Sequence, residues 1–142
     1  MARRIGLSFL LVCLSIVRPV AAGDGFVILV NRSNPITSIS RSDIKRTLNG
    51  GIKQWETGAV VQLGIIPSEA PETQYLASLI NLTPRELIAR IHEQVFKGEL
   101  RRPAILRGAA DCAAFARSSP GALCVAAEDQ PVPPEAHVVA VH

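Results

Sequence analysis

Residues 40–55 read SRSDIKRTLNGGIKQW, which is a short helix with its own start and stop signals. Ser40 is a favourable N-cap, and Asp43 stands where an acidic side chain can return the capping hydrogen bond. The Asn-Gly-Gly sequence at 49–51 ends the helix, because these residues readily adopt left-handed backbone conformations. Trp55, the only tryptophan, supplies apolar surface that anchors the following loop. Taken alone, this pattern predicts a surface helix followed by an anchored loop.

Apolar runs on both sides of this helix predict the remaining elements of one α/β domain. Residues 26–30 are continuously apolar, as expected for a strand that is buried on both faces. Further strands are expected at 59–67, 122–127 and 138–141, and further helices beginning at 68, 83 and 109. The order strand, helix, strand, several helices, strand predicts an α/β domain with a mainly parallel sheet flanked by helices.

The first 22 residues have the features of a signal peptide. Arg3 and Arg4 form a positive start, residues 5–17 are apolar, and residues 20–22 (VAA) resemble a cleavage site. The apolar run is shorter than the roughly 20 residues of a membrane-spanning helix. We therefore expect cleavage after these 22 residues and no stable membrane span. The mature domain, residues 23–142, would then be periplasmic or secreted; an uncleaved anchor is the alternative.

The positive charge of the chain belongs to this leader. The sequence has 15 Lys plus Arg and 12 Asp plus Glu, and three of the arginines are Arg3, Arg4 and Arg18. Without them, 12 basic and 12 acidic residues remain, which gives a net charge of zero. An evenly balanced domain lacks the basic surface typical of nucleic-acid binding, so we expect no nucleic-acid partner.

Several short motifs stand in an order that points to a known family. An apolar strand is followed by Asn34-Pro35, then by SDI at 42–44 and GIKQW at 51–55. The order continues with FKG at 96–98, RP at 102–103, AAF at 113–115 and PGAL at 120–123. Together these motifs resemble the phosphate ABC-transporter substrate-binding proteins over about residues 26–128. The resemblance implies a periplasmic-binding-protein-like fold. Full-length members clamp their anion between two lobes, whereas this chain is long enough for a single lobe.

The same resemblance places an anion site at the start of the helix after the second strand. The family has a Ser-Gly-Thr loop there, and this chain has Ser68 and Thr73 as the corresponding hydroxyls. Backbone N–H groups and the helix dipole favour an anion at such a position. However, Pro71 has no N–H to donate and Glu72 would repel an anion. An ordinary helix start with acidic residues is therefore the alternative interpretation.

Two further groups of residues are candidates for binding. Ser33 and Asn34 follow the first strand, where open α/β sheets often hold ligands, although Asn-Pro is also an ordinary turn. Arg101, Arg102 and Arg107 form a basic cluster that could attract an anion or an acidic partner. Solvated surface is the alternative for that cluster.

Two cysteines remain after removal of the leader, and an exported protein meets an oxidising compartment. Cys112 falls on the helix expected from 109, and Cys124 falls in the strand 122–127. Cys124 stands where the resembled family usually has Gly, so we expect the two cysteines to form a disulfide. Two buried free thiols are the alternative.

The sequence predicts no enzyme, cofactor or metal site. His92-Glu93 lacks the second histidine of a His-Glu-x-x-His motif, and no nucleophile elbow, Walker or dinucleotide-binding pattern is present. Two functions stay open. The first is an exported binding protein for phosphate or another oxyanion, associated with ABC-type transport or sensing, with Ser33, Asn34, Ser68 and Thr73 as anion contacts. The second is a periplasmic module that has lost the anion and contacts an envelope protein. A secreted hydrolase ranks below both.

Overall fold

The computed structural model describes residues 25–67 and 69–142, so the expected signal peptide and Ser68 lie outside the described residues. The elements in chain order are β1 (Phe26–Asn31), β2 (Ser38–Ile39), α1 (Arg41–Leu48), β3 (Gln62–Ile65), α2 (Pro71–Leu79), α3 (Pro84–Phe96), β4 (Ala104–Ile105), α4 (Ala109–Ser118), β5 (Ala122–Ala127) and β6 (Ala136–Val141). Within the described ranges, no helix is long and apolar enough to cross a membrane.

The six strands form one mixed sheet in the order β2-β6-β1-β5-β3-β4. Three of the five pairings are parallel, namely β2 with β6, β3 with β5 and β3 with β4. The central strand β1 is antiparallel to both of its neighbours, β5 and β6. The expected α/β class is therefore confirmed, and the sheet is mostly but not purely parallel. A strand that is buried on both faces has the same apolar pattern in either direction, so the sequence did not reveal this reversal.

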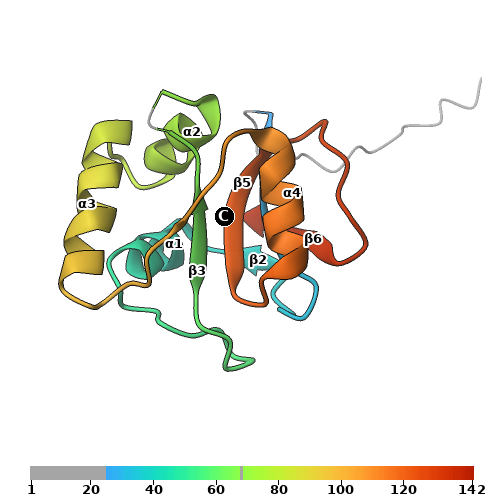
Figure 1. Ribbon diagram of the computed structural model, residues 1–142, viewed down its shortest axis with the longest axis horizontal. Helices are drawn as coiled ribbons and strands as arrows, with labels where there is room; N and C mark the ends of the chain where they lie inside the picture. Colours follow the sequence, from blue (N-terminus) through green and yellow to red (C-terminus); the bar gives the residue numbers. More distant parts are fainter. Residues whose placement is uncertain (1–24, 68) are drawn as a thin grey trace, which may run out of the picture.

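Helices cover both faces of the sheet, with α1, α2 and α3 on one side and α4 on the other (Figure 1). Alternating residues of β1 serve the two layers. Ile28 and Val30 are buried in the larger core with the three helices, whereas Leu29 is buried in the smaller core beneath α4. This double burial explains why β1 is apolar from Phe26 to Val30.

The motif at 40–55 forms the expected capped helix and anchored loop and is tied to the sheet, but within the described residues the Asp43 side chain does not return the capping hydrogen bond. The Oγ of Ser40 accepts a 3.0 Å hydrogen bond from the N–H of Asp43, which caps α1. The carboxylate of Asp43 pairs with Arg46 at 3.3 Å. The indole N–H of Trp55 donates to the carbonyl oxygen of Gly121 at 3.0 Å, just before β5. Trp55 thus anchors the loop both by its buried ring and by this hydrogen bond.

Helix α3 begins with a complete capping box. The N–H of Glu86 donates to the Oγ1 of Thr83 at 3.2 Å, and the N–H of Thr83 donates to the Glu86 carboxylate at 3.1 Å. The bond from the Thr83 backbone N–H, and secondly the Thr83 side chain, favour the ionised carboxylate and hold the pKa of Glu86 below its usual range. The start of α3 is therefore fixed by local residues.

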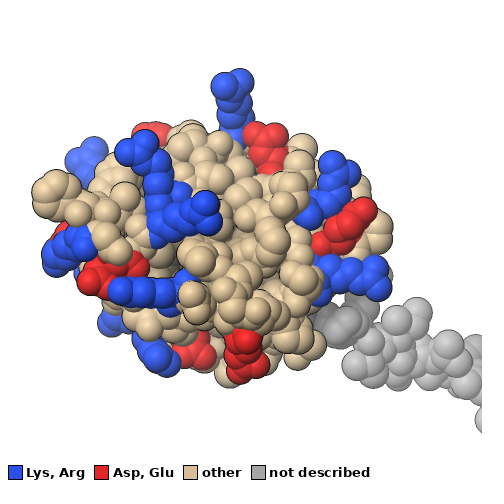
Figure 2. All heavy atoms as spheres, turned by 60° about the horizontal axis from the view of Figure 1, so that its bottom comes forward, with Lys and Arg blue, Asp and Glu red and all other residues tan. Residues whose placement is uncertain are grey.

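Charged side chains of both signs are interspersed on the face drawn in Figure 2, around a central area of uncharged surface. This mixture agrees with the equal numbers of acidic and basic residues after the first 22 positions.

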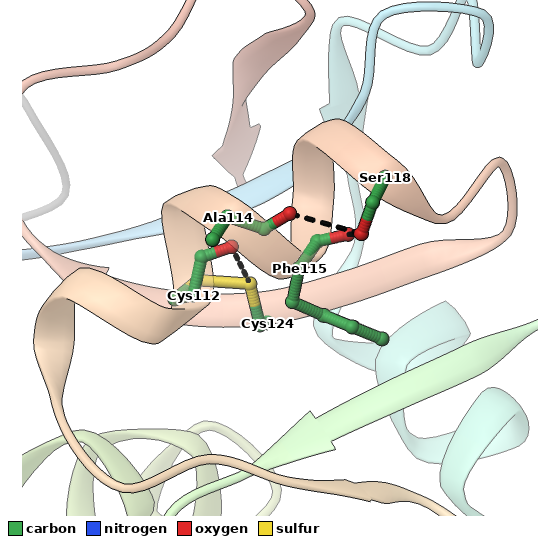
Figure 3. The surroundings of a disulfide bond; sticks show 5 residues. All are labelled: Cys112, Ala114, Phe115, Ser118 and Cys124. Atoms are coloured by element: carbon green, nitrogen blue, oxygen red, sulfur yellow. Dashed lines mark hydrogen bonds between the residues drawn. A yellow bond between two sulfur atoms is a disulfide. The ribbon is translucent and has the colours of Figure 1, made fainter.

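A disulfide joins Cys112 of α4 to Cys124 of β5, as expected (Figure 3). Both cysteines are buried in the smaller core, and their Cα atoms are 5.8 Å apart. The Sγ of Cys124 also lies 3.3 Å from the carbonyl oxygen of Cys112. The bond fixes α4 onto a central strand of the sheet.

Candidate functional site

The expected anion site lies where β3 leads into α2. The helix begins with Pro71 in its first turn, as predicted, and Ala70 occupies the N-cap without a side-chain hydrogen bond. The start of α2 therefore has no side-chain cap. Whether an anion can bind here depends on which backbone N–H groups and side-chain hydroxyls at the helix start are free to donate hydrogen bonds.

Thr73 uses its donors within the protein. Its side chain is buried, with 3% of the residue exposed, and its hydroxyl donates a 2.7 Å hydrogen bond to the carbonyl oxygen of Ile66. The N–H of Thr73 bonds to the carbonyl oxygen of Ala70 at 3.1 Å. Both donors of Thr73 are thus used within the protein: the hydroxyl joins α2 to the residue after β3, and the N–H bonds to the N-cap residue of α2.

The space beside Thr73 is also too small for an oxyanion. A hollow of about 10 Å³ is lined there by Gly64, Ile66, Glu72 and Thr73 among others, which is room for about one water molecule. Pro71 contributes no N–H. The presence of Glu72 at the hollow adds a negative charge where phosphate would sit.

Ser33 and Asn34 belong to a tight turn after β1. The Asn31 side-chain oxygen accepts hydrogen bonds from the Ser33 hydroxyl at 2.7 Å and from the Ser33 N–H at 3.0 Å. The Asn31 amide donates to the carbonyl oxygens of Ala116 and Arg117 at the end of α4. Asn31 therefore organises this turn, a role that its position directly after an apolar strand could have indicated.

Asn34 is the buried polar residue of the turn, with 1% of its surface exposed. Its side-chain oxygen accepts a 3.3 Å hydrogen bond from the N–H of Ile36. Its amide nitrogen has no hydrogen-bond partner within the described part of the chain. Buried below the surface, Asn34 supports the turn from inside.

The two pairs of predicted anion contacts are not brought together. Strand β1 is antiparallel to β5, whereas β3 is parallel to β5. The C-terminal ends of β1 and β3 therefore lie at opposite ends of the sheet strands. A six-residue strand spans about 20 Å. Ser33 and Asn34 therefore lie at one end of the strands, and Thr73 lies at the other end. One small oxyanion cannot contact both groups.

A larger hollow, of about 340 Å³, was not anticipated from the sequence. It is lined by Lys53, Val60, Val61, Gly98, Glu99, Leu100 and Arg101. The Lys53 ammonium lies 2.6 Å from the Glu99 carboxylate, and this hydrogen bond holds the pKa of Glu99 below its usual range. The charge of Lys53 is thereby balanced inside the hollow. Lys53 belongs to the GIKQW motif, which is the sequence feature that could have pointed to this hollow.

A second, mainly apolar groove of about 170 Å³ lies between α3 and the edge strand β4. It is lined by Ile65, Ile66, Pro67, Ile88, Ile91, His92, Pro103 and Ile105. Ile105 is 74% exposed beside this groove, and Phe96 at the end of α3 is 94% exposed. The basic cluster of Arg101, Arg102 and Arg107 lies on the segment that carries β4.

Comparisons with known proteins identify the fold. No family model matches the chain, and no curated protein matches it at a significant level. A phosphate ABC transporter substrate-binding protein from Clostridium perfringens, solved with bound phosphate, superposes with a TM-score of 0.62 at 15% identity, covering 83% of this chain and 45% of that one. An ABC-type phosphate transport receptor from Vibrio cholerae gives 0.62 at 14% identity, covering 83% and 47%. PstS from Borrelia burgdorferi gives 0.59 at 14% identity, covering 84% and 47%.

By their names, these neighbours are phosphate-binding proteins of ABC transporters. The family resemblance inferred from the short sequence motifs agrees with this result. The chain spans about half the length of the solved structures that it matches. At this level of identity the match concerns the fold. The chain therefore shares its fold with about half of each phosphate ABC-transporter substrate-binding protein that it matches.

Proposed function

We propose that the mature chain is a single-lobe, non-enzymatic relative of these binding proteins that acts by contacting another protein of the cell envelope. The observation that carries this proposal is the hydrogen bond from the Thr73 hydroxyl to the Ile66 carbonyl oxygen at 2.7 Å. It engages one of the two hydroxyl donors expected at an anion site at the start of α2.

The remaining groups at the start of α2 weaken an anion site further. Pro71 lacks an N–H, and Glu72 is acidic. Two like charges about 4 Å apart near a protein surface repel by roughly 4 kcal/mol at an effective dielectric constant of 20. Several charge-assisted hydrogen bonds would be needed to offset that repulsion. We infer that this lobe does not hold phosphate by itself.

Export is part of the proposal. Residues 1–22 have the sequence features of a cleaved leader, and residues 23–142 would then form the mature domain. The disulfide between Cys112 and Cys124 supports an oxidising compartment such as the periplasm.

A second candidate function is oxyanion binding linked to ABC-type phosphate transport or sensing. The fold shared with a phosphate-bound structure favours it. It would use Ser68 and Thr73 at the start of α2, with Ser33 and Asn34 as a separate contact region. The other half of the cage would have to come from a second chain.

The experiment is to isolate the tagged chain from the envelope of its own host and measure its size by gel filtration, with and without added phosphate. The proposal predicts a complex larger than the monomer whose size does not depend on phosphate. A monomer that binds phosphate tightly would contradict the proposal and favour the second candidate.

A further inference from the structure

We propose that the outer edge of β4 and the groove beside it bind an extended, acidic segment of a partner protein as an added strand. This inference rests on the proposed function and specifies the chemistry of the partner. It follows from three features of one surface: an open strand edge, an apolar groove and a basic cluster with an excess of positive charge.

Strand β4 is the last strand of the sheet on this side, so its outer edge is unpaired among the described elements. The N–H of Leu106 donates to the carbonyl oxygen of Ile65 at 2.8 Å, on the inner side. Because backbone groups alternate along a strand, the N–H and C=O of Ile105 point to the outer side. These two groups can pair with a strand from another protein.

The edge strand is joined to β3 by hydrogen bonds. The side-chain amide of Gln62 donates a 2.7 Å hydrogen bond to the carbonyl oxygen of Arg102, two residues before β4. The register pairs Gly64 with Ala104 and Ile65 with Ile105. A partner strand would therefore meet a preorganised edge, which reduces the entropy lost on binding.

The groove beside this edge suits a side chain better than a metabolite. Its volume of about 170 Å³ is below the roughly 300 Å³ at which small-molecule pockets begin. Ile88 and His92 of α3 lie on one wall, and Pro103 and Ile105 on the other. Alternate side chains of an added strand would point into this groove.

The charges along the edge select an acidic partner. Arg101 and Arg102 precede β4 and Arg107 follows it, and all three are exposed without an ion pair to any described residue. The nearby carboxylates offset only part of this positive charge, because Asp111 carries one negative charge beside three arginines. Asp111 accepts a 2.8 Å hydrogen bond from the N–H of Arg107, and Glu99 is paired with Lys53. Acidic residues of the partner would meet this excess of positive charge.

The length of the surface sets the length of the segment. The proposed binding surface runs along the chain from Leu100 and Arg101, which line the larger hollow, to Ile105, which lines the groove. Five residues of extended chain cover about 17 Å. The expected segment therefore has about five or six residues, with apolar residues at alternate positions and Asp or Glu between or beside them.

The test uses a displayed library of random ten-residue peptides as the probe, selected on the exported protein. Enriched peptides are then synthesised, and their affinities are measured by fluorescence anisotropy. The expected peptides alternate apolar and acidic residues. Their affinity should fall as the salt concentration rises, because the arginines contribute electrostatically.

Matched variants locate the site. Ile105→Pro removes the outward N–H, and proline is tolerated on an edge strand, so the variant should fold and bind at least about tenfold more weakly. Arg102→Glu should weaken binding by about tenfold or more. Val138→Pro and Arg41→Glu make the same kinds of change away from this surface and serve as controls. If the circular dichroism of Val138→Pro shows unfolding, Val138→Lys is used as the control in its place. Binding to the controls should equal binding to the original chain.

Each outcome is decisive. Enriched peptides that are sensitive to Ile105→Pro and Arg102→Glu but not to the controls support the proposal. Peptides that bind equally to all variants overturn the assignment to this edge and leave the proposed function standing. Failure to enrich any peptide also overturns the assignment to this edge. So does a homodimer that forms through Ile105 and prevents the peptides from binding. Tight phosphate binding would refute the proposed function separately.

Discussion

The hydroxyl of Thr73 lies 2.7 Å from the carbonyl oxygen of Ile66 and donates a hydrogen bond to it. The residue that resembles an anion ligand in the sequence therefore joins the first turn of α2 to the end of β3. The carbonyl of Ile66 is buried with its residue, so this bond contributes to the stability of the domain.

Replacing Thr73 by Val tests this structural role. The change keeps the shape but leaves a buried carbonyl without its partner, which should lower the free energy of unfolding by about 1–3 kcal/mol. Urea denaturation measures the loss. Thr37→Val, at an exposed position, is the control and should be nearly neutral. Unchanged stability for Thr73→Val would mean that the hydroxyl is free for another role.

Removal of the disulfide should destabilise the domain without changing its fold. Cys112 and Cys124 are 12 residues apart, and a closed loop of this size contributes about 3 kcal/mol. Urea denaturation with and without reductant should show this difference. A thiol assay on denatured, unreduced exported protein should find no reactive thiol. Two reactive thiols would refute the disulfide.

The pair of Lys53 and Glu99 should make stability sensitive to acid. The hydrogen bond from Lys53 holds the pKa of Glu99 below its usual range. A carboxylate with a lowered pKa in the folded state contributes stability above its unfolded pKa of about 4.3, and that contribution is lost as the pH falls further. Denaturation of Glu99→Gln at several pH values is the measurement. The variant should lose less stability than the original chain between about pH 6 and about pH 3, values that bracket this titration. Parallel curves would contradict the pairing.

Cleavage of the leader is expected after Ala22. Mass spectrometry of the exported fraction should find a chain that begins at Gly23. Ala22→Arg should block cleavage and leave a longer chain, because the cleavage site requires small residues. Asp24→Asn, outside that site, is the control and should be cleaved like the original chain. An intact N-terminus in the exported fraction of the original chain would contradict the expectation.

Local patterns predicted the elements well. Ser40 and Thr83 marked helix starts where the structure has them, because capping depends on residues within one turn. The helix expected from 68 begins at Pro71, three residues later. The strand at 122–127 has the predicted bounds, since a fully buried strand is continuously apolar. The two-residue strands β2 and β4 were missed because they are too short to produce a periodic pattern.

The site was harder to predict because it depends on strand direction and on individual hydrogen bonds. The sequence grouped Ser33, Asn34 and Thr73 as contacts of one ligand, but the antiparallel placement of β1 separates them. Nothing in the pattern around Thr73 revealed that its hydroxyl bonds to Ile66. The basic cluster at 101–107 was visible, whereas its position on an open sheet edge required the topology.

Calorimetric titration of the exported protein with phosphate distinguishes the two candidate functions in one measurement. Among the described residues at the start of α2, the Thr73 hydroxyl is already engaged and Glu72 adds a negative charge. We therefore predict no binding tighter than about 1 mM, which corresponds to a binding free energy of roughly −4 kcal/mol. Thr73→Val, carried through the same titration, should change nothing. A micromolar dissociation constant that Thr73→Val abolishes would contradict the proposed function and identify the chain as an oxyanion-binding protein.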